Sequence, residues 1–232
     1  AGLGNKTHND KHSSFNMTHV AGIVLCGGHS RRMGYSKSLL PFGDETMLQR
    51  VLRLLGPVVD PLVVVAARNQ ELPDLPPQVQ VAYDEAPDQG PLQGICAGLG
   101  ALQGLAEAAY ITSCDVPLLV PAFVETLIGA LGNHEIVVPV DSRFHHPLAA
   151  VYRIDVLDRI KQLLASDQRR PMFLIEQSDT VRITVDQLKA VDPDLLTLQN
   201  INQPADYLAA LKSSGLTAPH DVVAKLNNQD DG

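Results

Sequence analysis

The sequence predicts a single α/β domain with a Rossmann-like three-layer fold and a mostly parallel sheet. Short apolar runs rich in β-branched residues alternate along the chain with helical patterns. This alternation is typical of a parallel sheet that is covered by helices on both faces. The length of 232 residues and the hydrophobic content of 45% are sufficient for one such hydrophobic core.

The elements of the first two thirds follow from these patterns. Continuous apolar runs predict the strands, because a strand buried on both faces needs no polar alternation. We expect strands over residues 20–26, 62–67, 79–84, 108–115 and 135–140. Apolar residues at helical spacing predict helices over residues 45–56, 92–108 and 121–132. Pro121 opens the last of these helices, where its missing N–H costs nothing, and Gly132 ends it.

The C-terminal third is less regular. Residues 147–153 predict a strand that pairs antiparallel with its neighbour through the DSRFHH connection, and residues 182–186 predict a short further strand. Amphipathic patterns predict helices over residues 154–166 and 204–212.

Polar segments lie at both ends of the chain. Residues 1–19 have no continuous apolar core and are expected to be a disordered leader rather than a secretory signal, with Met17 as a natural start. Residues 213–232 turn polar and are expected to be a flexible tail. The predicted folded domain therefore spans residues 20–212.

Charge and cysteine content exclude several classes of protein. Eighteen Lys and Arg against 26 Asp and Glu give a formal charge of −8, which argues against a general binder of nucleic acid or anionic membranes. No stretch reaches about 18 uninterrupted apolar residues, the length that spans a bilayer. The three cysteines lack C-x-x-C spacing, which fits reduced thiols in a cytoplasmic protein.

A glycine-rich and basic loop, LCGGHSRRMGYSK, follows the first strand. Gly27 and Gly28 let backbone N–H groups approach a ligand, and Arg31, Arg32 and Lys37 supply positive charge in an acidic chain. Together they predict a cradle for a polyphosphate. The loop has neither the Gly-Lys-Ser/Thr of a Walker A motif nor the G-x-G-x-x-G of a dinucleotide site. A solvent-exposed turn is the structural alternative.

Carboxylates end two of the predicted strands. Asp115, in SCDVP, follows a buried strand and is the natural ligand for Mg²⁺, which binds through one or two carboxylates and substrate phosphates. A helix cap is the alternative for this residue. Asp84 ends a neighbouring strand and either contacts a base or ribose or caps a turn. Gly90 and Gly94 bracket a tight turn that could lie against a flat base.

Three residues carry weaker signals. His146 is either an acid or base or a structural turn residue, and Asn202 is either a ligand or a helix cap. Cys114, like the cysteine of the LCGG loop, is interpreted as a buried apolar residue.

These motifs resemble, in order, those of the nucleotidyltransferases related to molybdenum cofactor guanylyltransferase. LCGGHSRRMGYSK is similar to the family signature L-A-G-G-x-S-x-R-M-G-x-D-K, and the resemblance continues through GPLQG, CDVP, HPL and NIN, over residues 20–212. It implies a Rossmann-like domain that binds a nucleoside triphosphate and Mg²⁺ and transfers a nucleotidyl group with release of pyrophosphate. In the guanylyltransferase branch, GMP is added to the phosphate of molybdenum-bound molybdopterin.

The resemblance also implies roles for residues of this chain. Leu25, Cys26 and Gly27 would contact the nucleotide, Lys37 its phosphates and Asp84 the nucleoside, and Asp115 would bind Mg²⁺. The predicted nucleotide-binding set is Leu25, Cys26, Gly27, Gly28, Lys37, Asp84, Gly90 and Asp115.

A mechanism follows in which Asp115 holds Mg²⁺ across the triphosphate. Arg32 and Lys37 stabilise the α-phosphorus and the departing pyrophosphate, so that Arg32, Lys37 and Asp115 are the predicted catalytic residues. The pterin phosphate is already deprotonated, so it needs no general base. GTP and the molybdopterin-type cofactor are the expected partners, with transient contacts to other molybdenum cofactor proteins.

The chain departs from the family pattern at three positions. Cys26 stands where the signature usually has Ala, and Ser36 replaces the acidic residue before Lys37. Ala66 stands near a position where the family often has Asn after the second strand, which puts one nucleoside contact in doubt.

Other functions remain open on the sequence. A cytidylyltransferase or sugar-phosphate nucleotidyltransferase would keep the chemistry and change the substrates, although the second glycine of LCGG resembles the guanylyl branch more. A non-catalytic nucleotide-binding regulator could dispense with a metal carboxylate, whereas this chain retains Asp115. A nicotinamide-dependent oxidoreductase lacks its glycine fingerprint here.

Overall fold

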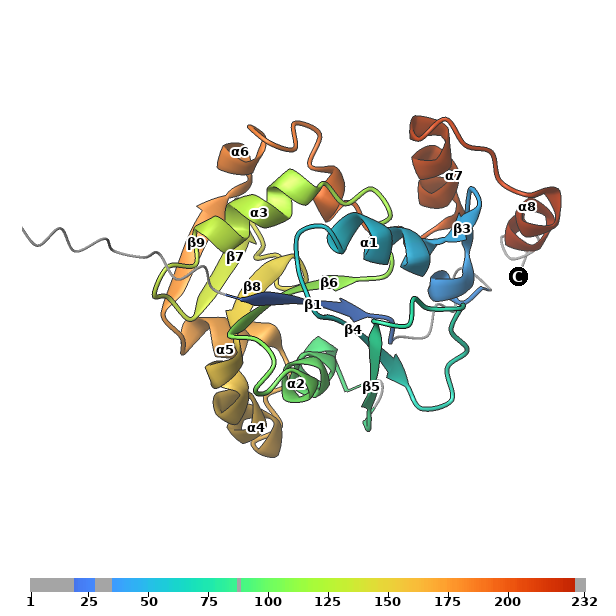
Figure 1. Ribbon diagram of the computed structural model, residues 1–232. Coiled ribbons are helices and arrows are strands. Elements are labelled where there is room, and N and C mark those ends of the chain that lie inside the picture. Colours follow the sequence, from blue (N-terminus) through green and yellow to red (C-terminus); the bar gives the residue numbers. More distant parts are fainter. Residues whose placement is uncertain (1–18, 28–34, 87–88, 228–232) are drawn as a thin grey trace, which may run out of the picture.

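A computed structural model describes residues 19–27, 35–86 and 89–227 (Figure 1). The leader expected over residues 1–19 lies outside this part except for His19.

A seven-stranded sheet is the middle layer, with the strand order β5-β4-β1-β6-β8-β7-β9. Its strands are β1 (Val20–Leu25), β4 (Leu62–Ala67), β5 (Gln80–Asp84), β6 (Ala108–Ser113), β7 (Ile136–Val140), β8 (Ala150–Arg153) and β9 (Thr180–Thr184). β8 pairs antiparallel with β6 and β7, and the other four pairings are parallel. The predicted mostly parallel sheet and its antiparallel strand are confirmed.

Helices cover both faces of the sheet (Figure 1). On one face lie α1 (Met47–Leu55) and α3 (Pro121–Gly129), and on the other lie α2 (Pro91–Ala101), α4 (Leu157–Ala165) and α5 (Pro171–Glu176). Each face has its own cluster of buried apolar side chains, and the central strands contribute alternate residues to the two clusters. This is the predicted three-layer fold.

Local signals explain where the first two helices begin. The Thr46 hydroxyl accepts from the Gln49 backbone N–H while the Gln49 side chain accepts from the Thr46 N–H, which forms a capping box at the start of α1. Gly90 precedes α2 at a φ of 92°, a conformation that favours glycine, and Pro91 occupies the first helical position.

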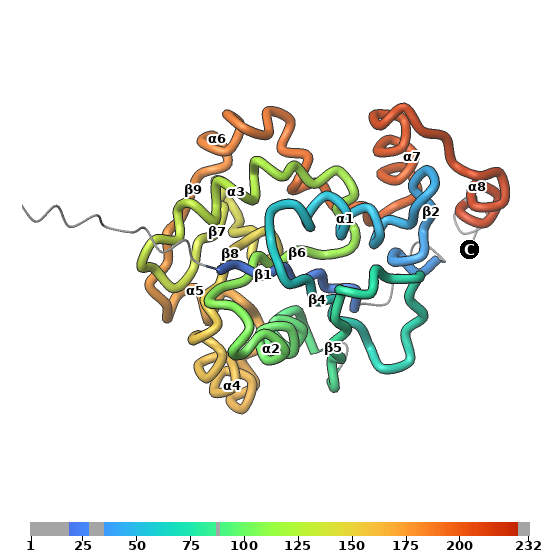
Figure 2. The backbone as a smooth tube through the Cα atoms, in the orientation of Figure 1, coloured from blue at the N-terminus to red at the C-terminus, as the bar shows by residue number. Residues whose placement is uncertain are grey.

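A smaller group of elements, with a third cluster of buried apolar side chains, packs against one end of the domain. It contains the 3₁₀ turn η1 (Lys37–Leu39), the hairpin of β2 (Pro41–Phe42) and β3 (Glu45–Thr46), and the helices α7 (Pro204–Ser213) and α8 (His220–Asn227). Figure 2 shows α7 and α8 beside the β2 segment, although Tyr207 of α7 is 166 positions away from Pro41 of β2 in the sequence. The Tyr207 hydroxyl donates to the Pro41 carbonyl, and the Lys225 ammonium lies over the Tyr35 ring.

The structure differs from the sequence expectation at two places in the C-terminal third. The strand expected over residues 182–186 runs instead over residues 180–184, because Thr184 caps the short helix α6 (Val185–Leu188). Residues 220–227, expected within a flexible tail, form α8, whose Val222 and Leu226 are each 1% exposed. Two apolar positions one turn apart are a weak sequence signal for a packed helix. The short turns η2 (Ile154–Val156) and η3 (Leu196–Leu198) complete the described elements.

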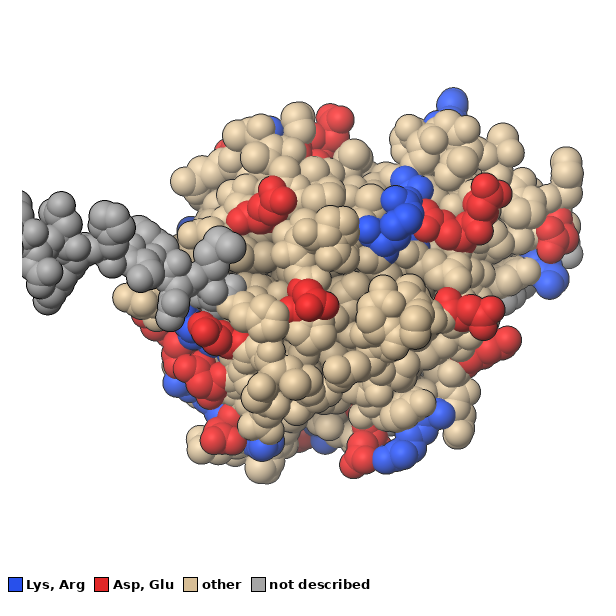
Figure 3. Space-filling view, viewed as in Figure 1, with Lys and Arg blue, Asp and Glu red and all other residues tan. Residues whose placement is uncertain are grey.

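The surface is mixed in charge. On the face drawn in Figure 3, Lys and Arg side chains are interspersed with Asp and Glu, and exposed pairs such as Arg53 with Glu45 and Arg68 with Glu85 form ion pairs. None of the described helices has the length and apolar character that crossing a membrane requires.

Candidate functional site

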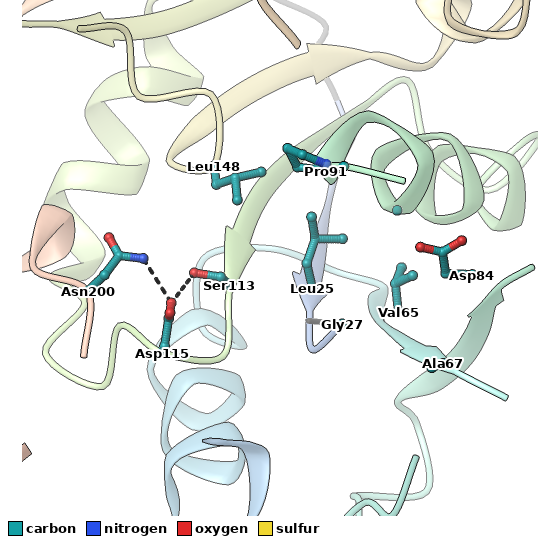
Figure 4. Close-up of a pocket in the computed structure, with 12 residues that line it drawn as sticks. Leu25, Gly27, Val65, Ala67, Asp84, Pro91, Ser113, Asp115, Leu148 and Asn200 are labelled. Atoms are coloured by element: carbon teal, nitrogen blue, oxygen red, sulfur yellow. Dashed lines mark hydrogen bonds between the residues drawn. The ribbon is translucent and has the colours of Figure 1, made fainter. Parts of the chain in front are cut away.

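The candidate site lies where the sheet changes its direction of winding. The chain passes from β1 to β4 and β5 on one side and then returns to β6 on the other side of β1. Ligands of open α/β sheets bind at such a point, at the carboxyl ends of the strands. A cavity of about 430 Å³ opens at this edge (Figure 4). Its lining consists of Leu25, Gly27, Val65, Ala67, Asp84, Gly90, Pro91, Gly94, Ser113, Asp115, Leu148 and Asn200.

Five members of the predicted nucleotide-binding set line this cavity: Leu25, Gly27, Asp84, Gly90 and Asp115. They come from the ends of β1, β5 and β6 and from the start of α2, as the parallel topology requires. The predicted residues Gly28, Arg31 and Arg32 lie outside the described residues, as do residues 87 and 88.

Asp115 is the centre of a polar cluster at one end of the cavity (Figure 4). The Ser113 hydroxyl donates to Asp115 Oδ1. The Asn200 amide donates to the same oxygen at 2.9 Å. Its Oδ2 accepts from the Lys37 ammonium at 2.7 Å. The Ile201 backbone N–H donates to the Asp115 carbonyl at 2.8 Å, which fixes the segment of Asn200 against the end of β6. Asp115 is 9% exposed, so its carboxylate lies at the rim of the core.

Lys37 is the last residue of the signature and the first of η1. Its ammonium bridges Asp115 Oδ2 and Asn202 Oδ1, each at 2.7 Å. The structure therefore brings the predicted phosphate-binding cation and the predicted metal ligand into direct contact. Asn202, which the sequence left as either a ligand or a cap, also joins this cluster through its side chain.

The middle of the cavity is apolar. Leu25 and Val65 lie on its floor, and Leu148 and Pro91 lie across from them (Figure 4). A Cβ built on Gly94 would lie 3.4 Å from Leu25 Cδ2, so a side chain at this position would crowd that floor. The apolar walls suit a flat ring.

Asp84 lies at the other end of the cavity from Asp115 (Figure 4). Its Oδ1 accepts from the Ala86 backbone N–H at 2.9 Å, and so it caps the turn after β5. The two interpretations of Asp84 are compatible, because a carboxylate that caps a turn with one oxygen still presents the other.

Cys26 does not line the cavity with its side chain. Cys26 and Cys114 are each 5% exposed and belong to the apolar cluster under α1 and α3. A hydrogen bond from the thiol to Cys114, together with burial, raises the pKa of Cys26 well above its ordinary value. Both cysteines are buried packing residues, as the sequence indicated. The Cys26 carbonyl accepts from the Gln70 amide at 2.8 Å, which ties the end of β1 to the turn after β4.

His146 and Ala66 also have defined environments. His146 Nε2 lies 3.1 Å from Asp141 Oδ2 in the connection between β7 and β8, a contact that orders this turn. Ala66 is fully buried, and its neighbours Val65 and Ala67 line the cavity instead.

Six lining residues had no individual role in the sequence analysis. Val65, Ala67 and Ser113 were assigned only to strands, and Pro91, Leu148 and Asn200 only to the GPLQG, HPL and NIN motifs. The HPL and NIN motifs were the available signal. HPL precedes β8, which is antiparallel to β6 and therefore begins at this edge of the sheet, and NIN precedes α7.

The polar cluster offers oxygen donors of the kind that a hard divalent cation prefers. Asp115 supplies a carboxylate, and Ser113 and Asn200 supply hydroxyl and amide groups beside it. Within the described residues, no three His, Cys, Asp or Glu side chains gather as a metal cage. Mg²⁺ usually binds through one or two carboxylates and takes its other ligands from phosphate groups and water.

Comparison with known proteins places these features in a family. Residues 22–181 match the model of the MobA-like NTP transferase domain. A protein of Mycobacterium ulcerans named "Probable molybdenum cofactor guanylyltransferase" is 37% identical over 198 residues, which cover 83% of this chain and 94% of that protein. A protein of Mycobacterium avium with the same name is 38% identical over 195 residues, covering 82% and 94% respectively.

Solved structures share the fold. Molybdopterin-guanine dinucleotide biosynthesis protein A of Archaeoglobus fulgidus superimposes with a TM-score of 0.68 at 22% identity, covering 84% of this chain and 98% of that one. A cytidylyltransferase of Leptospira borgpetersenii gives a TM-score of 0.62 at 17% identity, covering 92% and 96%. The match over more than half of the chain, together with relatives of this identity and coverage, shows that the chain belongs to the MobA-like NTP transferase family.

Proposed function

We propose that this enzyme transfers GMP from GTP to the phosphate of a molybdenum-bound molybdopterin and releases pyrophosphate. The observation that carries the proposal is the cavity at the ends of β1, β4 and β6, with apolar walls in its middle and the Asp115 cluster at one end. The relatives named as molybdenum cofactor guanylyltransferases support this choice of substrates.

The cavity suggests how GTP lies in the site. The guanine ring would lie between Leu25 and Val65 on one side and Pro91 on the other, where apolar side chains exclude water. Asp84 would receive hydrogen bonds from the nucleoside. The triphosphate would extend toward Asp115 and Lys37, and the N-terminus of α2 at Gly90 adds the favourable partial charge of a helix start.

A divalent cation fits at Asp115, and we propose Mg²⁺. Asp115 would hold it, with Asn200 and Ser113 orienting the carboxylate, and when bound the cation would neutralise charge on the triphosphate. Lys37 would contact the phosphates and stabilise the charge that grows on the departing pyrophosphate. We propose the same role for Arg32 from the sequence.

The reaction needs positioning more than covalent help. An oxygen of the pterin phosphate forms a bond to the α-phosphorus of GTP as the bond from that phosphorus to the bridging oxygen breaks, and pyrophosphate carries away the electron pair. No proton has to be removed from the nucleophile, so the contributions of this chain are orientation and charge stabilisation. The reduced buried thiols fit a cytoplasmic enzyme.

Nucleotide selectivity tests the substrate. Thermal melts with GTP, CTP, ATP and UTP, each with and without Mg²⁺, should give the largest stabilisation with GTP and Mg²⁺, because a ligand that binds only the folded state raises the melting temperature by mass action. A larger shift with CTP would move the assignment to a cytidylyltransferase. No shift with any nucleotide would favour a non-catalytic scaffold.

Asp115→Asn tests the metal and the chemistry together. The amide keeps the shape and removes the negative charge that the cation needs, so pyrophosphate release should collapse and Mg²⁺ should no longer enhance GTP binding. Asp44→Asn, an exposed carboxylate in the β2–β3 hairpin, is the matched control and should behave like the wild type. Near-normal pyrophosphate release from Asp115→Asn would overturn the metal assignment.

A further inference from the structure

Within the part of the chain that the structure describes, the Lys37 side chain makes two polar contacts, both with residues of the polar cluster around Asp115. Its ammonium lies 2.7 Å from Asp115 Oδ2 and 2.7 Å from Asn202 Oδ1. These three residues come from η1, the end of β6 and the turn before α7, so the ammonium joins three distant segments of the chain. Its side chain is 18% exposed, which places the charge at the mouth of the site.

The ammonium therefore lies among the oxygen donors that a divalent cation would use. Asp115 Oδ1 is already engaged by the Ser113 hydroxyl and the Asn200 amide, which leaves Oδ2 as the oxygen for an incoming cation. Lys37 holds that oxygen in the present arrangement. A divalent cation at Asp115 would have to displace an ammonium and then tolerate a like charge a few ångströms away, which is unfavourable in a partly buried site.

A bound triphosphate changes this balance. It offers Lys37 a stronger anionic partner than one shared carboxylate, and charge-assisted bonds to phosphate are among the strongest in proteins. The backbone beside Lys37 is anchored, since Leu40 is buried and its carbonyl accepts from Met47 N–H at 2.8 Å. The flexible, partly exposed side chain can therefore turn from Asp115 toward a phosphate while η1 keeps its place.

We propose that in the nucleotide-free enzyme the Lys37 ammonium occupies the cation position at Asp115 and leaves it only when a triphosphate binds. The divalent cation and the nucleotide then bind cooperatively. Without a nucleotide, the enzyme does not hold a divalent cation at the polar cluster around Asp115. The inference rests on the proposed function, because it takes Asp115 as the cation ligand. It adds that Lys37 controls when that ligand is available.

Mn²⁺ binding followed by electron paramagnetic resonance tests this without any turnover. The protein is titrated with Mn²⁺ alone and again with a GTP analogue whose α,β bridge is a methylene group. Lys37→Met keeps the apolar stem and removes the ammonium, and Lys37→Gln is a second variant with a polar end. Lys189→Met, at an exposed lysine directly after α6 that pairs with Asp186, is the matched control. A thermal melt of each variant shows that it is folded.

Without nucleotide, both Lys37 variants should bind Mn²⁺ about tenfold more tightly than the wild type and the control, within the usual range of coupling between two sites. With the analogue, the wild type should gain much more Mn²⁺ affinity than the Lys37 variants do. Equal nucleotide-free affinities for the wild type and the Lys37 variants would overturn the inference. If the analogue still promoted Mn²⁺ binding in that case, the proposed function would stand. No Mn²⁺ binding by any variant, with or without the analogue, would overturn the proposed metal site and this inference together.

Discussion

Gly98 of α2 lies directly against Ile23 of β1, so that a Cβ built on Gly98 would be 2.7 Å from Ile23 Cγ2 and 2.9 Å from its Cδ1. The helix can approach the sheet this closely only because the position has no side chain. One turn earlier, Gly94 of the same helix lies against Leu25 on the floor of the cavity. The close approach therefore sets the depth of the cavity as well as the packing of α2.

Gly98→Ala should destabilise the protein, whereas Gly100→Ala should not. Alanine favours a helix by up to about 1 kcal/mol over glycine, but at Gly98 the new methyl group must displace Ile23, and overpacking of this kind costs about 1–3 kcal/mol. A Cβ on Gly100 of the same helix meets nothing within 4 Å. Chemical denaturation of both variants gives the comparison. Equal stabilisation by the two substitutions would contradict the close contact.

Glu135 should make stability depend on pH. The hydrogen bonds from Arg159, at 3.0 Å to each carboxylate oxygen, and from the Asp179 backbone N–H lower the pKa of Glu135 below its ordinary value. A lowered pKa in the folded state means that this stabilisation is complete above the pKa of the unfolded chain and is lost as the pH falls through the folded value.

Glu135→Gln should therefore lower the free energy of unfolding by about 0.5–1 kcal/mol near pH 7. This is the upper part of the range for surface ion pairs, because the contact with Arg159 is bidentate. The difference from the wild type should shrink as the pH falls below 4.5, the ordinary pKa of this group. Denaturation midpoints between pH 3 and 7 measure it. Glu125→Gln, an exposed carboxylate on α3, is the control. A difference that stays constant over this range would contradict the role of the charge.

One of the three cysteines should react much faster than the other two. Cys26 and Cys114 are each 5% exposed, whereas Cys96 on α2 is only partly buried. Buried thiols are poorly accessible to a reagent and react slowly. Labelling of the native protein with a chromogenic disulfide should show one fast thiol, and Cys96→Ala should remove it, while all three react in denaturant. A fast phase that survives in Cys96→Ala would contradict this packing.

The central fold could be predicted because its strands are continuous apolar runs, a pattern set by burial on both faces. The convergence of Asp115 and Asp84 on one edge also followed, since parallel strands place their carboxyl ends together. The contacts of Lys37 with Asp115 and Asn202 could not be predicted from the sequence in this way. Asp115 is 78 positions and Asn202 165 positions away from Lys37, and the contacts depend on how η1 and the turn before α7 pack.

The C-terminal region shows a second limit. Only half of the residues of α8 are apolar, and its packing in the third apolar cluster makes Val222 and Leu226 core residues. Likewise, the end of β9 depends on the capping box between Thr184 and Gln187, which competes with an apolar pattern that continues through Val185. At α8 a tertiary contact, and at β9 a local one, overrides the structure that the sequence pattern favours.

Asp192 is the buried carboxylate that positions the segment leading to Asn200. It is 1% exposed, and its two oxygens accept from the backbone N–H groups of Leu196 and Thr197, each at 2.9 Å. The Thr197 hydroxyl in turn accepts from the Val120 N–H at 3.0 Å. This chain of contacts attaches the turn η3 to the start of α3, three residues before Asn200 reaches the Asp115 cluster.

Asp192→Asn should weaken both the fold and the site. The amide nitrogen cannot accept a hydrogen bond, so one buried N–H loses its partner, at a cost of about 1–3 kcal/mol. Because the displaced turn carries Asn200, GTP with Mg²⁺ should also stabilise the variant less than it stabilises the wild type. Asp194→Asn, two residues along the same turn and exposed, is the matched control. Thermal melts of both variants with and without GTP and Mg²⁺ measure the two effects. A lower melting temperature with an unchanged ligand-induced shift would show that Asp192 supports the fold alone and does not position Asn200.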